Sequence, residues 1–123
     1  MSIIKNILFV GAGSFLGGAL RYLVSQGLKY TGGFPWATFT VNLLGCLIIG
    51  LLWGVFSRFS NASQHLVLFL TVGFCGGFTT FSTFSKESVM LLQSGHYFML
   101  ALYVLGSVSI GLGLVAVGYF LTK

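Results

Sequence analysis

The stretch GFCGGFTTFSTFSKE, residues 73–87, lies in an apolar segment and combines two adjacent glycines with five hydroxyl side chains. Gly76 and Gly77 weaken a helix here, and the hydroxyl residues after them compete for backbone hydrogen bonds. Inside a membrane, non-helical backbone is tolerated only where it is buried in protein or lines a watery cavity. The pattern therefore predicts a spanning helix that breaks near Gly76–Thr79 and exposes carbonyls, which suit a hard monovalent cation or an ordered water. A glycine-kinked helix packed in the core is the alternative.

The composition of the whole chain places this segment in a membrane protein. Of 123 residues, 56% are hydrophobic and 6% are charged, whereas a soluble domain carries about a quarter charged residues. The 18 glycines are also typical of membrane helices, in which glycine lets neighbouring backbones approach closely. These values exclude a soluble enzyme, a disordered chain and a secreted disulfide scaffold. Enzyme chemistry is not expected, because no nucleophile–base pair, cofactor loop or metal constellation is visible in the sequence.

Four membrane-spanning helices follow from the apolar runs, because one span needs about 20 mostly apolar residues. We predict these helices over residues 3–26, 35–56, 65–93 and 97–121. Together they form a single all-α transmembrane domain over residues 1–123. The protein is therefore expected to be a multi-pass protein of the cell inner membrane or plasma membrane.

Several small residues in these helices are interpreted as packing residues. Gly13 and Gly17, spaced by four, predict a close-packing face on the first helix. Cys46 and Cys75 lie inside apolar runs, which favours a packing role over a disulfide or a metal site. Neither histidine has a ligand-spaced partner. The fourth helix carries a less regular glycine face, at Gly106, Gly111, Gly113 and Gly118.

The positive charges carry information about orientation rather than about nucleic acid. The formal net charge is +5, but the basic residues are scattered singly, so no cluster could follow a phosphate backbone. Four spans place Lys5, Arg58 and Lys123 on one side of the membrane and Arg21, Lys29 and Lys86 on the other. Because each side carries three basic residues, no lysine/arginine bias favours one orientation in the membrane. Either other features set the orientation, or copies insert both ways and pair antiparallel about a two-fold axis.

Aromatic and hydroxyl residues form two stripes if the helix resumes after the glycines. Phe74, Phe78, Phe81 and Phe84 recur at steps of four, three and three, and therefore lie roughly on one face. Ring edges are positive and favour an anion, and hydroxyl groups donate hydrogen bonds to the same charge. A lining for a small anion is the functional interpretation, and ordinary aromatic packing is the alternative. The neighbouring polar face consists of Thr79, Ser82, Thr83 and Lys86.

Other polar residues in the helices could join such a route. Asn42 lies deep in the second helix, and its amide can donate two hydrogen bonds. Arg21 ends the predicted first helix and either snorkels to the head groups or raises the local anion concentration at a pore mouth. Tyr103 and Ser107 share a face of the fourth helix. Glu87 directly follows Lys86, is interpreted as part of a rim pair, and is not assigned to ion selectivity.

Two other functional classes compete with an anion channel. A small four-helix dual-topology multidrug exporter needs a membrane-embedded carboxylate to couple protons to a cationic substrate. The chain has one acidic residue, Glu87, at the edge of a helix. A membrane scaffold without transport would use its hydroxyl and amide groups only for helix association.

Three motifs resemble those of the CrcB/Fluc family of fluoride channels. The segment GSFLGGALRY (13–22) is similar to the first-helix motif of that family, and VNLLG (41–45) is similar to its second-helix motif. The segment GFCGGFTTFSTF (73–84) resembles the most characteristic part of the family. The resemblance extends over essentially the whole chain in length, segment order and motif spacing.

The resemblance implies a fold, an activity and a set of site residues. Members of the family are dual-topology antiparallel homodimers with two pores that export fluoride passively. By matching positions, Asn42, Phe81 and Phe84 would line each fluoride path. Arg21 would lie at the vestibule. The backbone carbonyls of Gly76 and Thr79 from both subunits would hold a structural sodium ion at the dimer centre. Weaker candidates for a hydroxyl-lined route are Thr80, Ser82, Thr83, Tyr103 and Ser107.

Overall fold

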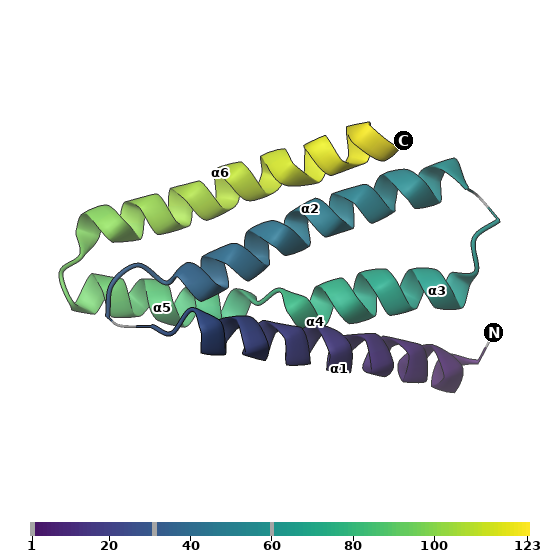
Figure 1. Ribbon diagram of the computed structural model, residues 1–123, viewed down its shortest axis with the longest axis horizontal. Coiled ribbons are helices and arrows are strands. Elements are labelled where there is room, and N and C mark those ends of the chain that lie inside the picture. The colour runs from purple at the N-terminus through teal and green to yellow at the C-terminus, as the bar shows by residue number, and fades with distance from the viewer. Residues whose placement is uncertain (1, 31, 60) are drawn as a thin grey trace.

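Helices make up nearly all of the computed structural model, which describes residues 2–30, 32–59 and 61–123 (Figure 1). Among these residues, four helical segments are long and apolar enough to cross a membrane, which confirms an all-α protein with four spans. The first, second and fourth spans are α1 (Ile3–Gly27), α2 (Trp36–Arg58) and α6 (Tyr97–Thr122). The third is divided into α3 (Gln64–Leu68), the π-helix η1 (Phe69–Cys75), α4 (Gly76–Phe78) and α5 (Phe81–Gln93).

The spans alternate in direction, so both ends of the chain lie at the same end of the molecule (Figure 1). Local signals set the connections between them. Pro35 immediately precedes α2, where its missing N–H costs nothing. Gly95 adopts a φ of 78° in the short turn between α5 and α6, a conformation that glycine reaches without strain.

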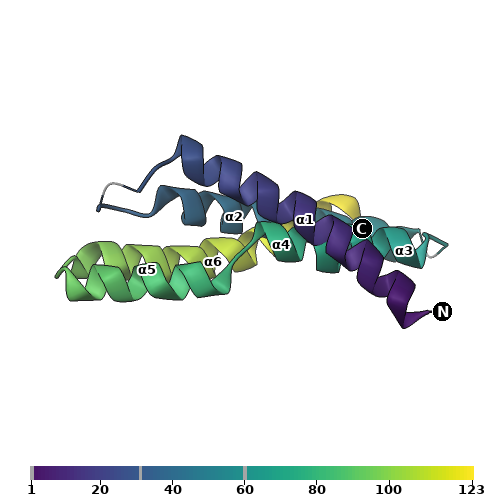
Figure 2. The same cartoon turned by 90° about the horizontal axis from the view of Figure 1, so that it is seen from below.

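Two helix pairs carry most of the packing. In one pair, α2 lies along α6; in the other, α1 lies along η1 and α4. Figure 2 shows α1 crossing α4 obliquely. The broken third span therefore lies between α1 on one side and the α2–α6 pair on the other.

Glycines on both partners bring α1 into backbone contact with the third span. A methyl group on Gly13 would lie 2.7 Å from the Phe74 nitrogen, and one on Gly17 would lie 2.7 Å from the Phe78 nitrogen. From the other side, a methyl group on Gly77 would lie 2.6 Å from the Ser14 carbonyl oxygen. The close-packing face predicted at Gly13 and Gly17 is thus confirmed.

A second glycine contact joins α2 to α6. A methyl group on Gly118 would lie 2.6 Å from the Leu51 nitrogen, and one on Gly54 would lie 2.7 Å from the Tyr119 carbonyl oxygen. The predicted face on the fourth helix is only partly correct, because nothing lies within 4 Å of a methyl group placed on Gly113.

The third span departs from a regular helix at two places. Its η1 section is a π-helix, in which the Thr71 hydroxyl donates to the Val67 carbonyl at 2.6 Å. Farther along, Thr79 and Thr80 are extended, with ψ angles of 161° and 124°. The sequence predicts a break near Gly76–Thr79, whereas the structure keeps Gly76–Phe78 helical and extends Thr79 and Thr80. Gly77 allows α1 to approach the backbone of the third span closely. The extended backbone of Thr80 is hydrogen-bonded by a side chain of α2, that of Asn42.

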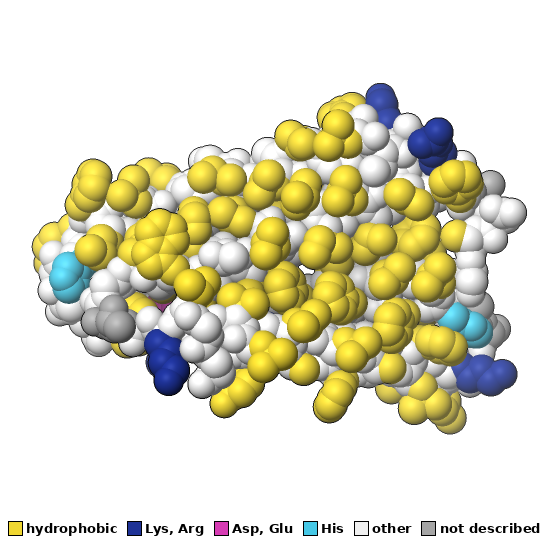
Figure 3. Space-filling model, in the orientation of Figure 1, with side chains coloured by type: hydrophobic (Ala, Val, Ile, Leu, Met, Phe, Trp, Pro, Cys, Tyr) yellow, Lys and Arg dark blue, Asp and Glu magenta, His cyan; other side chains and the backbone are white. Residues whose placement is uncertain are grey.

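The outer surface is that of a protein embedded in lipid. Apolar side chains cover most of the face seen in Figure 3, and the visible Lys and Arg side chains lie toward its two ends. Large side chains such as Phe15 and Phe98 are 75% and 77% exposed. A bilayer accommodates such a surface, and the chain is a multi-pass membrane protein.

The glycine contact between α1 and the third span can be tested by adding one methyl group. In Gly17→Ala, the new group meets the carbonyl oxygen of Phe74, and we expect a loss of about 1–3 kcal/mol of stability from overpacking. Gly18→Ala is the matched control, because nothing lies within 4 Å of its methyl group. The thermal unfolding midpoint in detergent measures both variants. Equal midpoints for the two would contradict this packing.

Candidate functional site at the break in the third span

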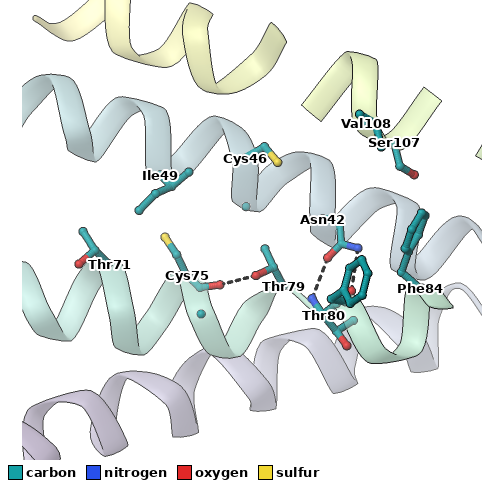
Figure 4. A pocket seen from close by; sticks show the side chains of 13 residues that line it. Asn42, Cys46, Ile49, Thr71, Cys75, Thr79, Thr80, Phe84, Ser107 and Val108 are labelled. Atoms are coloured by element: carbon teal, nitrogen blue, oxygen red, sulfur yellow. Dashed lines mark hydrogen bonds between the residues drawn. The ribbon is translucent and has the colours of Figure 1, made fainter. Parts of the chain in front are cut away.

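The Asn42 side chain holds the break through two hydrogen bonds to one residue. Its amide nitrogen donates to the Thr80 carbonyl at 3.0 Å, and its amide oxygen accepts from the Thr80 N–H at 2.8 Å. Figure 4 shows Asn42 pointing from α2 toward this backbone. The amide of α2 thereby replaces the helical partners that extended Thr80 gives up. A buried backbone group without a partner is costly, so Asn42 is what permits the extended conformation.

This arrangement frees two backbone carbonyls. In a continuous helix, the Thr80 N–H would donate to the Gly76 carbonyl, but here it donates to Asn42. The Thr83 N–H would donate to the Thr79 carbonyl, but here it donates to the Thr80 hydroxyl at 3.2 Å, which caps α5. Side chains have therefore taken the usual donors of both carbonyls.

The first helix holds the other side of the break. Nε of Arg21 donates to the Gly77 carbonyl at 3.1 Å, and the Ser14 hydroxyl donates to the Gly73 carbonyl at 3.3 Å. Arg21 is half-buried inside α1, which continues to Gly27, one residue beyond the predicted range of 3–26. One guanidinium nitrogen of Arg21 thus forms a hydrogen bond to the backbone of the third span.

A cavity of about 500 Å³ opens beside the break. It brings together most of the predicted site: Asn42, Gly76, Thr79, Thr80, Phe81, Phe84 and Ser107. The predicted residues Arg21, Ser82, Thr83 and Tyr103 do not line it.

The aromatic residues differ strongly in exposure. The Phe81 ring is 78% exposed, and its centroid lies 6.0 Å from that of Phe84. Phe84 in turn packs against Tyr103 at 4.9 Å, and Tyr103 is fully buried. The Phe81 ring is thus largely exposed, whereas the Phe84 ring is supported by the buried ring of Tyr103.

Two hydroxyl groups of α6 have different roles. The Tyr103 hydroxyl donates to Oε1 of Glu87 at 2.9 Å, so the carboxylate pairs with the fourth span rather than forming the rim pair with Lys86 that the sequence suggests. The Ser107 hydroxyl is buried and has no hydrogen-bond partner among the described residues. Because Ser107 lines the cavity, its hydroxyl is available to a bound group.

Three residues outside the predicted site also line the cavity: Cys46, Thr71 and Cys75. A signal for them exists in the spacing. Thr71, Cys75 and Thr79 follow one another at steps of four, and Cys46 lies four residues after Asn42. Residues four apart share a helix face, so each cysteine belongs to the face that carries a predicted site residue.

Oxygen atoms dominate the groups that could hold a metal ion here. The described residues contain no group of three or more His, Cys, Asp or Glu side chains placed to bind a metal. The freed carbonyls of Gly76 and Thr79 are neutral oxygen ligands, and nothing lies within 4 Å of a methyl group placed on Gly76. This donor chemistry fits a hard cation such as sodium.

Comparisons with known proteins match nearly the whole chain. The sequence model of the family described as "CrcB-like protein, Camphor Resistance (CrcB)" matches residues 8–119. A protein of Phocaeicola vulgatus is 43% identical over 121 residues, which cover 97% of this chain and 99% of the relative. A protein of Chlorobaculum tepidum is 45% identical over 122 residues, with coverages of 98% and 97%. Both relatives are named "Fluoride-specific ion channel FluC".

The energetic role of Asn42 can be measured by removing its amide. Asn42→Leu keeps a similar volume but leaves the N–H and C=O of Thr80 without partners, at a cost of about 1–3 kcal/mol for each unpaired group. We expect a clearly lower thermal unfolding midpoint in detergent. Asn6→Leu is the matched control, because the Asn6 amide oxygen is buried without a partner among the described residues. If both variants unfolded at the same temperature, Asn42 would not hold the break.

Proposed function

The chain belongs to the CrcB family, and from this premise we propose that it is a fluoride-selective channel through which fluoride leaves the cell passively. Such a channel lowers cytoplasmic fluoride without a chemical step, and is therefore not an enzyme. The observation that carries the proposal is the nearly full-length identity of over 40% to proteins named as fluoride-specific channels. The cavity beside the break supplies groups that suit a small anion.

Neutral donors and ring edges would carry the ion. Fluoride is strongly hydrated, so a selective path has to replace its water with other donors. Asn42 uses one amide N–H for Thr80, which leaves the second for an anion. Ser107 offers a buried hydroxyl that no other described residue bonds, and Phe81 and Phe84 offer positive ring edges. These four residues are the proposed core of the route.

The remaining predicted residues would act at its margins. Thr80 and Ser82 lie 3.3 Å apart through their hydroxyl oxygens and would extend the polar surface beyond the break, together with Thr83. Tyr103 would act by holding the Phe84 ring, because its own hydroxyl donates to Glu87. Arg21 keeps guanidinium nitrogens beyond the one that bonds Gly77, and these would give the vestibule a positive charge.

A second copy of the chain would complete the pore. The strongly exposed Phe81 ring and the open cavity lie on a face that one chain leaves uncovered. The equal division of lysine and arginine residues between the two sides of the membrane imposes no single orientation. We therefore propose an antiparallel homodimer with two pores, one for each cavity.

The carbonyls of Gly76 and Thr79 from both copies would hold a structural sodium ion at the centre of this dimer. The bonds that Asn42 and Thr80 make to neighbouring N–H groups support the proposal, because they leave these oxygens free. When bound, the ion would supply a fixed positive charge to these carbonyls, whose usual helical N–H donors bond side chains instead. It would remain in place rather than be transported.

Anion efflux from proteoliposomes tests the proposed activity. Purified protein is reconstituted into liposomes loaded with both fluoride and chloride, and ion-selective electrodes follow the two anions after potassium permeability is provided. We expect rapid fluoride efflux, with chloride leaving no faster than from protein-free liposomes. Negligible efflux of both anions, or equally rapid efflux of both, would refute the proposal.

Cysteine labelling tests the antiparallel pairing separately. In a protein with Cys46→Ser and Cys75→Ser, the exposed Lys5 is replaced by cysteine, and intact cells are treated with a membrane-impermeant maleimide. Because oppositely inserted copies pair about a two-fold axis, we expect roughly half of the protein to be labelled before the membrane is permeabilised. Complete labelling or complete protection at that stage would show a single orientation.

A further inference from the structure

Two basic residues lie together at the membrane end where α2 and α6 finish. Arg58 is the last residue of α2, and Lys123 directly follows α6; both side chains are exposed. Figure 3 shows two Lys or Arg side chains close to each other at this end of the molecule. Neither belongs to the cavity beside the break in the third span.

Specific contacts lock the two helix ends together. The Thr122 hydroxyl donates to the Leu51 carbonyl of α2 at 2.9 Å and to the Gly118 carbonyl of its own helix at 2.8 Å. A methyl group on Gly54 would lie 2.9 Å from the backbone nitrogen of Lys123. The C-terminal ends of α2 and α6, which carry Arg58 and Lys123, are therefore fixed relative to each other.

Each of the two cations lies near one aromatic ring. The Lys123 Nζ lies 4.7 Å from the centroid of Phe120, and the Arg58 guanidinium lies 5.7 Å from that of Phe59. Slightly deeper, Trp53 of α2 packs against Tyr119 of α6 with tilted rings whose centroids lie 4.0 Å apart. Tryptophan and tyrosine favour the head-group level of a bilayer, so these rings place the two cations at the lipid–water interface.

No acidic side chain balances this charge. The only carboxylate side chain of the chain, Glu87, lies in α5 and accepts a hydrogen bond from Tyr103. A second copy of the chain would bring a further net charge of +5, so its charge does not complement this surface. A negatively charged group from the bilayer does complement it.

We propose that Arg58 and Lys123 form a binding site for the phosphate head group of an anionic phospholipid, whose acyl chains lie along the Trp53–Tyr119 pair. Basic residues between helix ends at the membrane surface attract anionic lipids, and aromatic rings contact the adjoining glycerol and acyl region. This site is independent of the proposed fluoride route, because none of its residues lines the cavity.

Tryptophan fluorescence provides a local test, because the chain has two tryptophans: Trp36 begins α2, and Trp53 lies near the end of α2 that carries Arg58. In Trp36→Phe, Trp53 is the sole reporter. The protein is reconstituted in mixtures of phosphatidylcholine and phosphatidylglycerol, with one or the other lipid brominated as a quencher. We expect brominated phosphatidylglycerol to be preferred at Trp53 by between about twofold and tenfold, and added salt to reduce this preference.

Charge-removing variants identify the residues responsible. In the Trp36→Phe background, Arg58→Gln with Lys123→Gln should abolish the preference. Lys29→Gln, which removes one exposed charge on the other side of the membrane, should leave it intact. Equal quenching by the two lipids in Trp36→Phe, or a preference that survives in the double variant, would overturn the proposal. So would loss of the preference on adding inorganic phosphate at constant ionic strength, since that would show a site for free phosphate.

Discussion

The two hydrogen bonds between the Asn42 amide and the backbone of Thr80 are the interaction on which the break in the third span depends. Backbone N–H and C=O groups at membrane depth have no water with which to form hydrogen bonds. A spanning helix can therefore be interrupted only where other protein groups replace its lost hydrogen bonds. Asn42 replaces both lost bonds of Thr80, because its amide nitrogen donates to the carbonyl and its amide oxygen accepts from the N–H. The cost of the break is thereby removed at Thr80, and the carbonyls of Gly76 and Thr79 lose their usual helical donors.

The first helix contributes a second constraint from the opposite side. Gly13 and Gly17 allow α1 to reach the backbone of the third span, and Arg21 bonds the Gly77 carbonyl. One side of the broken segment is thus occupied by α1, while the side beside α2 remains open as a cavity. The glycines of α1 thus fix one side of the third span, whereas the side chains of Asn42 and Thr80 take the usual donors of its freed carbonyls.

Much of the fold follows from the sequence, because apolar length dictates spans and glycine spacing indicates close helix contacts. The details of the break do not follow. The two adjacent glycines suggest that Gly76 and Gly77 unwind, yet both stay helical, because it is Asn42, far away in the sequence, that stabilises Thr80. Likewise, Glu87 next to Lys86 indicates a rim pair, but the Tyr103 hydroxyl reaches it from α6. Contacts between residues distant in sequence decide both cases. The break, the aromatic stripe and Asn42 were nevertheless visible as candidates, because their residue types are unusual at membrane depth.

We propose that the break held by Asn42 creates the route for the anion. Fluoride efflux from liposomes that contain folded, monodisperse Asn42→Leu protein tests it most directly, at the same protein density as the unmodified chain. We expect fluoride efflux to fall to the level of protein-free liposomes, because the amide donor and the extended backbone at Thr80 are lost together. Fluoride efflux at the rate of the unmodified protein would contradict it.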